Sequence, residues 1–346
     1  MKSRLANKQR RSVLKAAGLV GMSTVLSPLI IRDAYAKTSI EVVLTTGLKL
    51  ANYGPIYVAA QQGLFEKHGL SMAVETGGSV AEPISIALSG RGQFAATGSG
   101  MAVNSTIEGG RMKVIAKMCG ALGMWIISKP GTKFDSLADF KGKRVASMRF
   151  PSNTVTSPTF AMKKFANIDA KEAGVEFVEG PPGSIIGAVR DGRADVGVVF
   201  EWDASIATAQ NDLQISYAFA DQMGPVLLTS VMVKESYAKE NADTVQRFCN
   251  ALAESMKLIR DDNSVYVKAM AKEFPNLEQS VLDAGCKRLL STPGFVPINP
   301  IITKQEWDTI MEHDQLAGTV RKTLSFEEMV DNQFAEKATK EFGLEG

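Results

Sequence analysis

Two stretches of this chain, 102 positions apart, follow the same local plan. Residues 84–100 read ISIALSGRGQFAATGSG, and residues 186–202 read IGAVRDGRADVGVVFEW. Each begins with an apolar run at helical spacing, turns at a glycine, and ends in a short run of small apolar residues. Gly78 and Gly180 stand at the same offset. A chain that repeats this plan is expected to build the same kind of lobe twice.

The segments around both stretches alternate between strand and helix patterns. In the first half, the run at 39–47 is a predicted strand, and residues 54–69 are a predicted amphipathic helix with a proline near its start and a glycine at its end. The same order restarts after about residue 130. Such alternation favours α/β sheets in which helices connect parallel strands. The expected class is therefore α/β, with two lobes.

The expected domain boundaries follow from the restart. One lobe takes residues 37–127 and 226–346, and the other takes residues 128–225. We expect the chain to cross between the lobes near 128–133 and again around Gly224. The last third carries apolar residues at helical spacing, so it is predicted to be a helical tail packed on the first lobe.

Residues 1–36 have the layout of an export signal. A basic head, an apolar run and small residues up to Ala36 predict cleavage after that alanine and residence in the periplasm. Arg10 and Arg11, followed by SVLK, resemble the twin-arginine signal. The alternative is an uncleaved anchor, which an apolar run of only about 16 residues containing Pro28 disfavours.

Charge and reactive side chains narrow the classes of function. The leader holds seven of the 39 basic and one of the 37 acidic residues, so the remaining chain has 32 basic and 36 acidic residues, a net charge of −4. No nucleic-acid partner is therefore expected. Only two histidines occur, His68 and His313, which argues against a metal site or a catalytic triad. The three cysteines, Cys119, Cys249 and Cys286, lack zinc-like spacing; they allow one disulfide and require none.

Four motifs, taken in order, carry a family resemblance. They are NYGPIYVAAQQGLFEKHGL, ISIALSGRGQFAATG, LADFKGKRVAS and AVRDGRADVGVVFEWD. Over about residues 40–260, and after an export signal, they resemble the substrate-binding proteins of ABC importers. The likeness is strongest to the group for nitrate, taurine, alkanesulfonates (SsuA-like) and thiamine-pyrimidine precursors (NMT1/THI5-like). It implies a type II periplasmic-binding-protein fold, with two α/β lobes joined by a two-stranded hinge.

The resemblance also implies a way of working. In open α/β sheets, ligands bind beyond the carboxyl ends of the strands, where helix N-termini favour anionic groups. Closure of two such lobes about a hinge captures a solute without a nucleophile, metal or general base. We therefore expect a non-enzymatic monomer without cofactors, which holds a small-molecule ligand and delivers it to the transmembrane permease subunits of an ABC importer.

Candidate ligand contacts follow the predicted strands. Asn52 and Tyr53 lie between the first strand and its helix, and offer an amide, a flat ring and a hydroxyl. Ser99 and Glu201 stand at equivalent places in the two related stretches, each just past a strand, so both are expected to face the cleft. Met101 belongs to the same turn as Ser99. Loop capping and ring packing are the alternative roles for the first pair.

Glu201 and Trp202 form the most specific candidate pair. A carboxylate beside an indole suits a positively charged or amine-bearing ligand. The alternative is that Glu201 pairs with an arginine such as Arg149, while Trp202 packs inside its lobe. Trp125 is expected to pack in the core at the crossover, with a place in the cleft wall as the alternative.

The segment RFPSNTVTSP, residues 149–158, resembles the anion-contacting turn of the family. It departs from the usual pattern because a Phe-Pro step stands where many members have Gly-Ser, which puts a sulfonate or nitrate contact in doubt. Simple capping of the following helix is the alternative role. The candidate ligand contacts in this segment are Arg149, Ser152, Asn153 and Thr154.

The ligand class stays open at this point. Glu201 favours an amine-bearing molecule, either taurine-like or a basic heterocycle such as a pyrimidine, whereas the helix-start cluster favours an anionic group. A zwitterion satisfies both. The alternatives to an importer component are a THI5-like biosynthetic enzyme on the same fold and a ligand-sensing protein that docks a membrane receptor.

Overall fold

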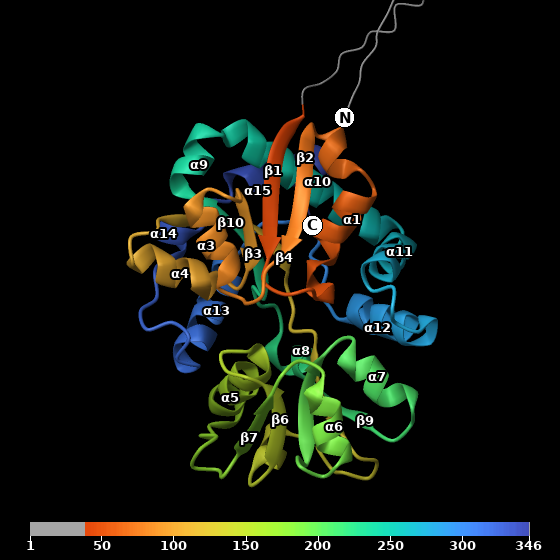
Figure 1. Cartoon of the computed structure of the whole chain (residues 1–346). Helices are drawn as coiled ribbons and strands as arrows, with labels where there is room; N and C mark the ends of the chain where they lie inside the picture. The colour runs from red at the N-terminus through yellow and green to blue at the C-terminus, as the bar shows by residue number, and fades with distance from the viewer. Residues whose placement is uncertain (1–38, 346) are drawn as a thin grey trace, which may run out of the picture. The chain divides into compact units, whose positions relative to one another are not determined.

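The computed structural model describes residues 39–345, which form two five-stranded α/β sheets, one per lobe (Figure 1). The predicted fold class is confirmed, whereas the export signal predicted at residues 1–36 lies outside the described residues. The first sheet has the order β2-β1-β3-β10-β4 and the second β7-β6-β8-β5-β9. The strands are β1 (Ile40–Thr46), β2 (Leu70–Thr76), β3 (Phe94–Thr97), β4 (Met112–Cys119), β5 (Met124–Ser128), β6 (Arg144–Met148), β7 (Glu176–Gly180), β8 (Val196–Phe200), β9 (Gln214–Ala218) and β10 (Thr229–Lys234).

The helices fall into three groups along the chain. The first lobe contains η1 (Ala51–Tyr53), α1 (Gly54–Gln61), α2 (Leu64–Lys67), α3 (Glu82–Ser89) and α4 (Ser99–Ile107). The second lobe contains η2 (Leu137–Phe140), α5 (Asn153–Ala166), α6 (Ser184–Arg190), α7 (Asp203–Ala209) and α8 (Phe219–Met223). The tail contains α9 (Glu235–Glu240), α10 (Ala242–Asp261), α11 (Ser264–Glu273), α12 (Gln279–Ser291), α13 (Lys304–Leu316), α14 (Phe326–Met329) and α15 (Gln333–Phe342). Among the described residues, no helix combines the length and apolar character needed to cross a membrane.

Three strands of each sheet follow the parallel pattern that the sequence predicts. β1 pairs in parallel with β2 and β3, and β6 pairs in parallel with β7 and β8. β3 is buried along its whole length because helices cover both faces, which explains its run of small apolar residues. The two related stretches form α3–β3 and α6–β8, in equivalent positions of the two sheets.

Each sheet also contains one strand that arrives from the other lobe. β5 follows β4 directly and runs antiparallel to β8, and β10 follows the second lobe and runs antiparallel to β3 and β4. The connecting segments, 120–123 and 224–228, lie side by side, since Val226 N donates to Gly120 O at 3.0 Å. They form the two-stranded hinge. The first crossing lies before the position expected from the sequence, because the buried run MWIIS is a strand of the second sheet.

The helix predicted over residues 54–69 is interrupted. α1 ends at Gln61 and α2 begins at Leu64, with Gly63 between them at φ 66°. This left-handed conformation is accessible to glycine at little cost and stops the first helix.

The helical tail contacts both lobes. α10 packs on α1 and α15, as expected for a tail on the first lobe. In addition, α12 packs against α7 and α13 packs against α5, on the two sides of the second lobe in Figure 1. The prediction of a tail packed on the first lobe therefore covered only part of its contacts. Helical spacing identified the helices but not these distant partners.

The contact between α12 and the second lobe contains a buried carboxylate, that of Glu201. The Glu201 side chain is fully buried and forms an ion pair with Arg288 of α12. The Arg288 guanidinium also donates to Ser205 Oγ at 2.9 Å and lies 5.6 Å from the centre of the Trp125 ring. Ser205 N donates to Glu201 Oε2 at 3.1 Å. Glu201 is thus compensated by an arginine from the tail, so removal of that arginine leaves a buried carboxylate.

We predict that Arg288→Met destabilises the protein by about 3 kcal/mol, because it leaves the Glu201 carboxylate buried without its cation. Lys287→Met is the matched control, since Lys287 is an exposed neighbour in the same helix and its replacement is expected to change stability by less than about 0.5 kcal/mol. The measurement is the free energy of unfolding in urea. The double variant Glu201→Gln/Arg288→Met is expected to be more stable than Arg288→Met alone. Equal stability of the Arg288 and Lys287 variants would refute this role.

All three cysteines are buried and free. Burial raises the pKa of the Cys119 and Cys286 thiols to about 12, and also raises the pKa of Cys249. Because the thiolate is the reactive form, these groups are unreactive at neutral pH in the folded protein. The disulfide that the sequence allowed is not formed.

We predict that no thiol of the folded protein reacts with Ellman's reagent at pH 8 within minutes, and that three thiols per chain react in guanidinium chloride. Absorbance of the released thiolate measures both states. Rapid reaction of the folded protein would show that at least one of these sites opens to solvent.

Candidate ligand-binding cavity

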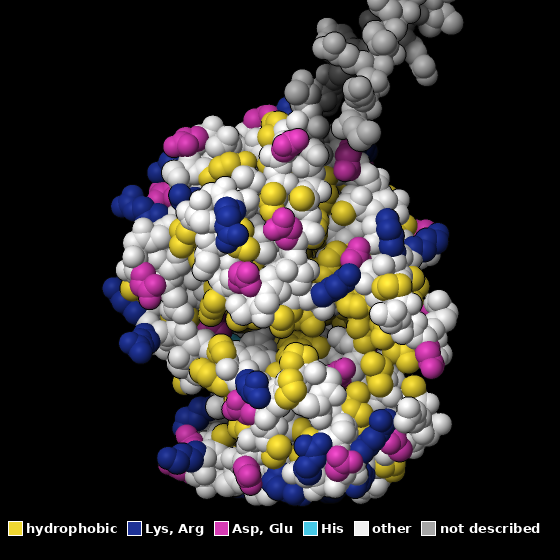
Figure 2. All heavy atoms as spheres, viewed as in Figure 1, with side chains coloured by type: hydrophobic (Ala, Val, Ile, Leu, Met, Phe, Trp, Pro, Cys, Tyr) yellow, Lys and Arg dark blue, Asp and Glu magenta, His cyan; other side chains and the backbone are white. Residues whose placement is uncertain are grey.

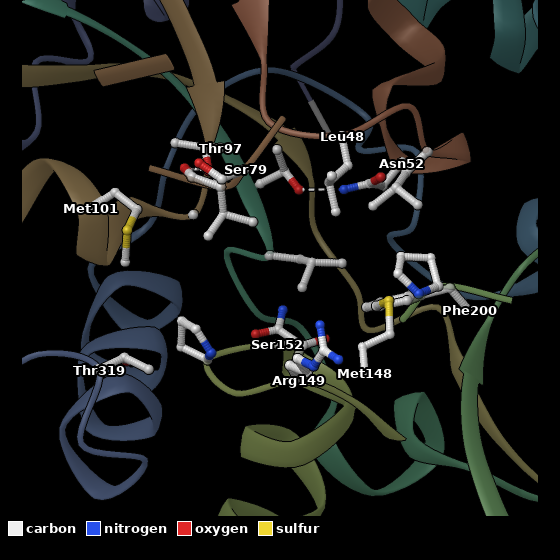
Figure 3. A pocket seen from close by; sticks show the side chains of 18 of the residues that line it. Leu48, Asn52, Ser79, Thr97, Met101, Met148, Arg149, Ser152, Phe200 and Thr319 are labelled. Atoms are coloured by element: carbon white, nitrogen blue, oxygen red, sulfur yellow. Dashed lines mark hydrogen bonds between the residues drawn. The ribbon is translucent and has the colours of Figure 1, made fainter. Parts of the chain in front are cut away.

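A cavity of about 430 Å³ lies between the two lobes and is lined by residues of both. In Figure 2, apolar side chains gather around the hollow that separates the lobes. Figure 3 shows Leu48, Asn52 and Thr97 of the first lobe facing Met148, Arg149 and Ser152 of the second. These residues follow or end strands, so the cavity lies where the carboxyl ends of the two sheets meet.

The turns after equivalent strands form opposite walls. Gly78 follows β2 and Gly180 ends β7, and both line the cavity, which accounts for their equal offset in the sequence. Gly98 and Gly100 border the cavity where α4 begins, and Ser152 and Asn153 border it where α5 begins. Two helix N-termini therefore reach the cavity, one from each lobe. The positive ends of these helix dipoles favour electronegative groups of a ligand.

The lining is mainly apolar. Of the described residues that line the cavity, only Arg149 and Asp314 carry a charge. Such a cavity suits an organic solute with an apolar body and few polar groups. The apolar side chains are those of Leu48, Leu50, Val80, Met101, Met148, Pro151, Pro181, Pro182, Phe200 and Leu228.

Six of the ten candidate contacts border the cavity: Asn52, Tyr53, Met101, Arg149, Ser152 and Asn153. The Asn52 amide nitrogen donates to Thr229 Oγ1 at 2.7 Å, while its buried Oδ1 has no hydrogen-bond partner among the described residues. Tyr53 accepts a hydrogen bond from Gly47 N at 3.4 Å, and burial raises the pKa of its hydroxyl to about 12. The Asn52 Oδ1 is thus closed off from the cavity, and the Tyr53 hydroxyl holds the adjacent loop.

The second-lobe turn is arranged by α5. Ser152 is the N-cap residue, and its Oγ accepts from Thr154 N at 3.3 Å. Asn153 Oδ1 accepts from Thr156 Oγ1 at 3.3 Å. Arg149 is exposed at the cavity and forms no ion pair with another described residue. The capping role that the sequence left open is thus present, and Arg149 remains free to meet an anionic group.

The other four candidates do not border this cavity. Ser99 is fully buried, with its Oγ 2.8 Å from Ser230 Oγ, and Thr154 is fully buried, with its Oγ1 accepting from Met148 N at 2.9 Å. Glu201 pairs with an arginine, which was the alternative role expected for it, but the partner is Arg288 of the tail and not Arg149. Trp202 packs on Phe274 and over Gly285, where a Cβ would lie 2.8 Å from the indole. Trp125 is buried in β5.

Two kinds of lining residue were missed. Val80 and Pro181 follow strands, so the rule that found Asn52 would also have found them if it had been applied to every strand. Asp314 and Thr319 lie at the end of a tail helix and beyond it, where no local pattern marks a cavity.

The two lobes, the two-stranded hinge and the interlobe cavity define a type II periplasmic-binding-protein fold. The family described as NMT1/THI5 like matches residues 51–263, and the chain belongs to this family. Among the described residues, no group of three or more His, Cys, Asp or Glu side chains is arranged to hold a metal ion.

Several known proteins are similar to this chain. The Bacillus subtilis (strain 168) protein named "Putative binding protein YtlA" is 23% identical over 296 residues, which cover 84% of this chain and 87% of that protein. The periplasmic aliphatic sulphonate binding protein SsuA from Escherichia coli superposes with a TM-score of 0.68 at 14% identity, covering 84% of this chain and 92% of that one. The periplasmic nitrate-binding protein NrtA from Synechocystis PCC 6803 gives a TM-score of 0.67 at 11% identity, covering 88% and 89%. At these identities the two structures are alike in fold.

Proposed function

We propose that the protein is the periplasmic solute-binding component of an ABC importer. It captures a small organic solute between its lobes, closes about the hinge, and delivers the solute unchanged to the permease subunits. It acts as a monomer after export, with the leader removed after Ala36. The observation that carries this proposal is the interlobe cavity of about 430 Å³, which is within the roughly 300–1,000 Å³ of small-molecule sites.

The lining supports an organic solute over a small inorganic ion. A nitrate-sized anion would leave most of this apolar volume unfilled, whereas a sulfonate, carboxylate or heterocycle with an apolar body would fill it. Arg149 and the start of α5 receive the anionic group, and the start of α4 borders the solute from the first lobe. Met101 and Tyr53 contact the apolar body.

The first test is a thermal-shift screen of the purified protein against sulfonates, amino acids, aromatic acids, pyrimidines and flavins. A solute at 100 times its Kd is expected to stabilise the protein by about 2.7 kcal/mol. Each hit is then incubated with the protein and analysed by mass spectrometry. Recovery of unchanged solute supports a binding protein, whereas chemical conversion favours an enzyme of the THI5-like type. Co-purification with permease subunits separates an importer component from a sensor.

We predict that Arg149→Met weakens binding of an anionic hit by about 1.5 kcal/mol, the lower end for a charge-assisted hydrogen bond, because Arg149 is exposed to water. Arg193→Met is the matched control: it removes an arginine from the same lobe, outside the cavity. Isothermal titration calorimetry measures both. Equal affinities of the two variants would show that Arg149 does not contribute to binding of the anionic group.

A further inference from the structure

Asp314 brings a carboxylate from the helical tail to the wall of the interlobe cavity. It lies near the end of α13, which packs against both α4 and α5. Its Oδ2 atom covers Gly100 in the first turn of α4, where the Cβ of any other residue would collide with it. Gly100 therefore leaves the space that this carboxylate occupies beside the cavity.

One oxygen of this carboxylate is held and the other is free. Asp314 Oδ1 lies 2.8 Å from Nδ1 of His313, and Nε2 of the same ring lies 3.1 Å from Ser157 Oγ of α5. The ring can thus donate to the carboxylate while it accepts from the serine hydroxyl. Among the described residues, Oδ2 has no hydrogen-bond partner. The Asp314 side chain is 14% exposed, so it keeps some accessible surface at the cavity.

No lysine or arginine among the described residues forms an ion pair with this carboxylate. The other charged lining residue is Arg149, which forms no ion pair with Asp314. His313 is almost completely buried, and it fixes the direction of the carboxylate toward the cavity. A carboxylate oxygen that faces a largely apolar cavity is poorly hydrated. This loss of hydration costs free energy, which a ligand offsets when it supplies a hydrogen-bond donor.

We propose that Asp314 is the subsite for a protonated amine, and that the solute is a zwitterion with an apolar body. Its acidic group meets Arg149 and the start of α5, and its amine meets Oδ2 of Asp314. Arg149 follows β6 of the second lobe, whereas Asp314 lies against α4 of the first. The acidic group and the amine of the solute therefore meet residues that different elements supply, one from the second lobe and one from the tail. This inference rests on the proposed solute-binding function.

The proposed amine contact at Asp314 differs from the amine contact that the sequence predicted. Glu201 was the candidate amine contact, but its carboxylate is used by Arg288 and does not reach the cavity. Asp314 provides the same chemistry from a different element. Because α13 contacts α5 through His313 and Ser157, a ligand held at Asp314 is connected to both lobes at once.

The test uses matched probes in isothermal titration calorimetry. The probes are 6-aminohexanoate, hexanoate, 4-(aminomethyl)benzoate and 4-methylbenzoate, so each zwitterion has a partner without the amine. We expect at least one zwitterion to bind about 10- to 100-fold more tightly than its partner, the range of a charge-assisted hydrogen bond. Asp314→Asn, which keeps the shape and the contact with His313, is expected to reduce this preference to within about 3-fold. Affinity for the partner without the amine should change little.

Asp308→Asn is the matched control, because it removes an exposed carboxylate from the same helix and should preserve the preference. The comparison of probes on the unmodified protein needs no variant, so it tests the amine preference even if Asp314→Asn fails to fold. Equal binding of the members of each pair, or failure of both zwitterions while other solutes of the screen bind, overturns the amine subsite and leaves the proposed function intact. Absence of binding by every solute overturns both.

Discussion

The exchange of one strand between the two sheets is the constraint on which the rest of the molecule depends. β4 ends in the first sheet and β5 begins in the second after four residues, and the return segment pairs with this connection through backbone hydrogen bonds. Because both crossings are short and paired, the lobes share one pivot. The carboxyl ends of their parallel strands then face a common space. The interlobe cavity follows from this connectivity, and its chemistry follows from the turns that the strands present to it.

The helical tail adds a second set of connections around that pivot. At one side, Arg288 of α12 compensates the buried Glu201; at the other, His313 of α13 contacts Ser157 of α5. Both contacts join the tail to the second lobe, although most of the tail packs on the first. Any opening of the lobes must keep, shift or break these contacts. The relative stability of open and closed forms therefore depends on buried polar pairs far from the strands, as well as on the ligand.

Local periodicity was sufficient to predict the α/β class, the two lobes and many of the strands, because these patterns depend on residues close in sequence. It did not place MWIIS in the second sheet, since a short buried strand looks the same in either sheet. It also predicted one helix where Gly63 separates two.

The candidate site also contains residues that local sequence predicts and residues that only tertiary packing places. Residues placed by the turn after a strand, such as Asn52 and Ser152, border the cavity as predicted from their positions. Glu201 does not, because its partner Arg288 is 87 residues away and no local signal links them. The sequence did not indicate Asp314 as a site residue, because an aspartate near the end of an amphipathic helix is normally solvated. Tertiary packing brings it to the cavity.

The two related stretches show how one local plan came to serve two roles. After β3, small residues let α4 begin at the cavity, and Gly100 leaves room for the Asp314 carboxylate. After β8, at the equivalent place, Glu201 and Trp202 fill the space and pack against α12. The second lobe meets the cavity through Phe200 at the end of β8, through the turn between β6 and α5, and through residues 180–182 after β7. The two stretches are thus structurally equivalent, but the polar residues that follow their strands are not. The tail packs on both: Asp314 brings a charge to the cavity beside α4, whereas Arg288 pairs with Glu201 away from it.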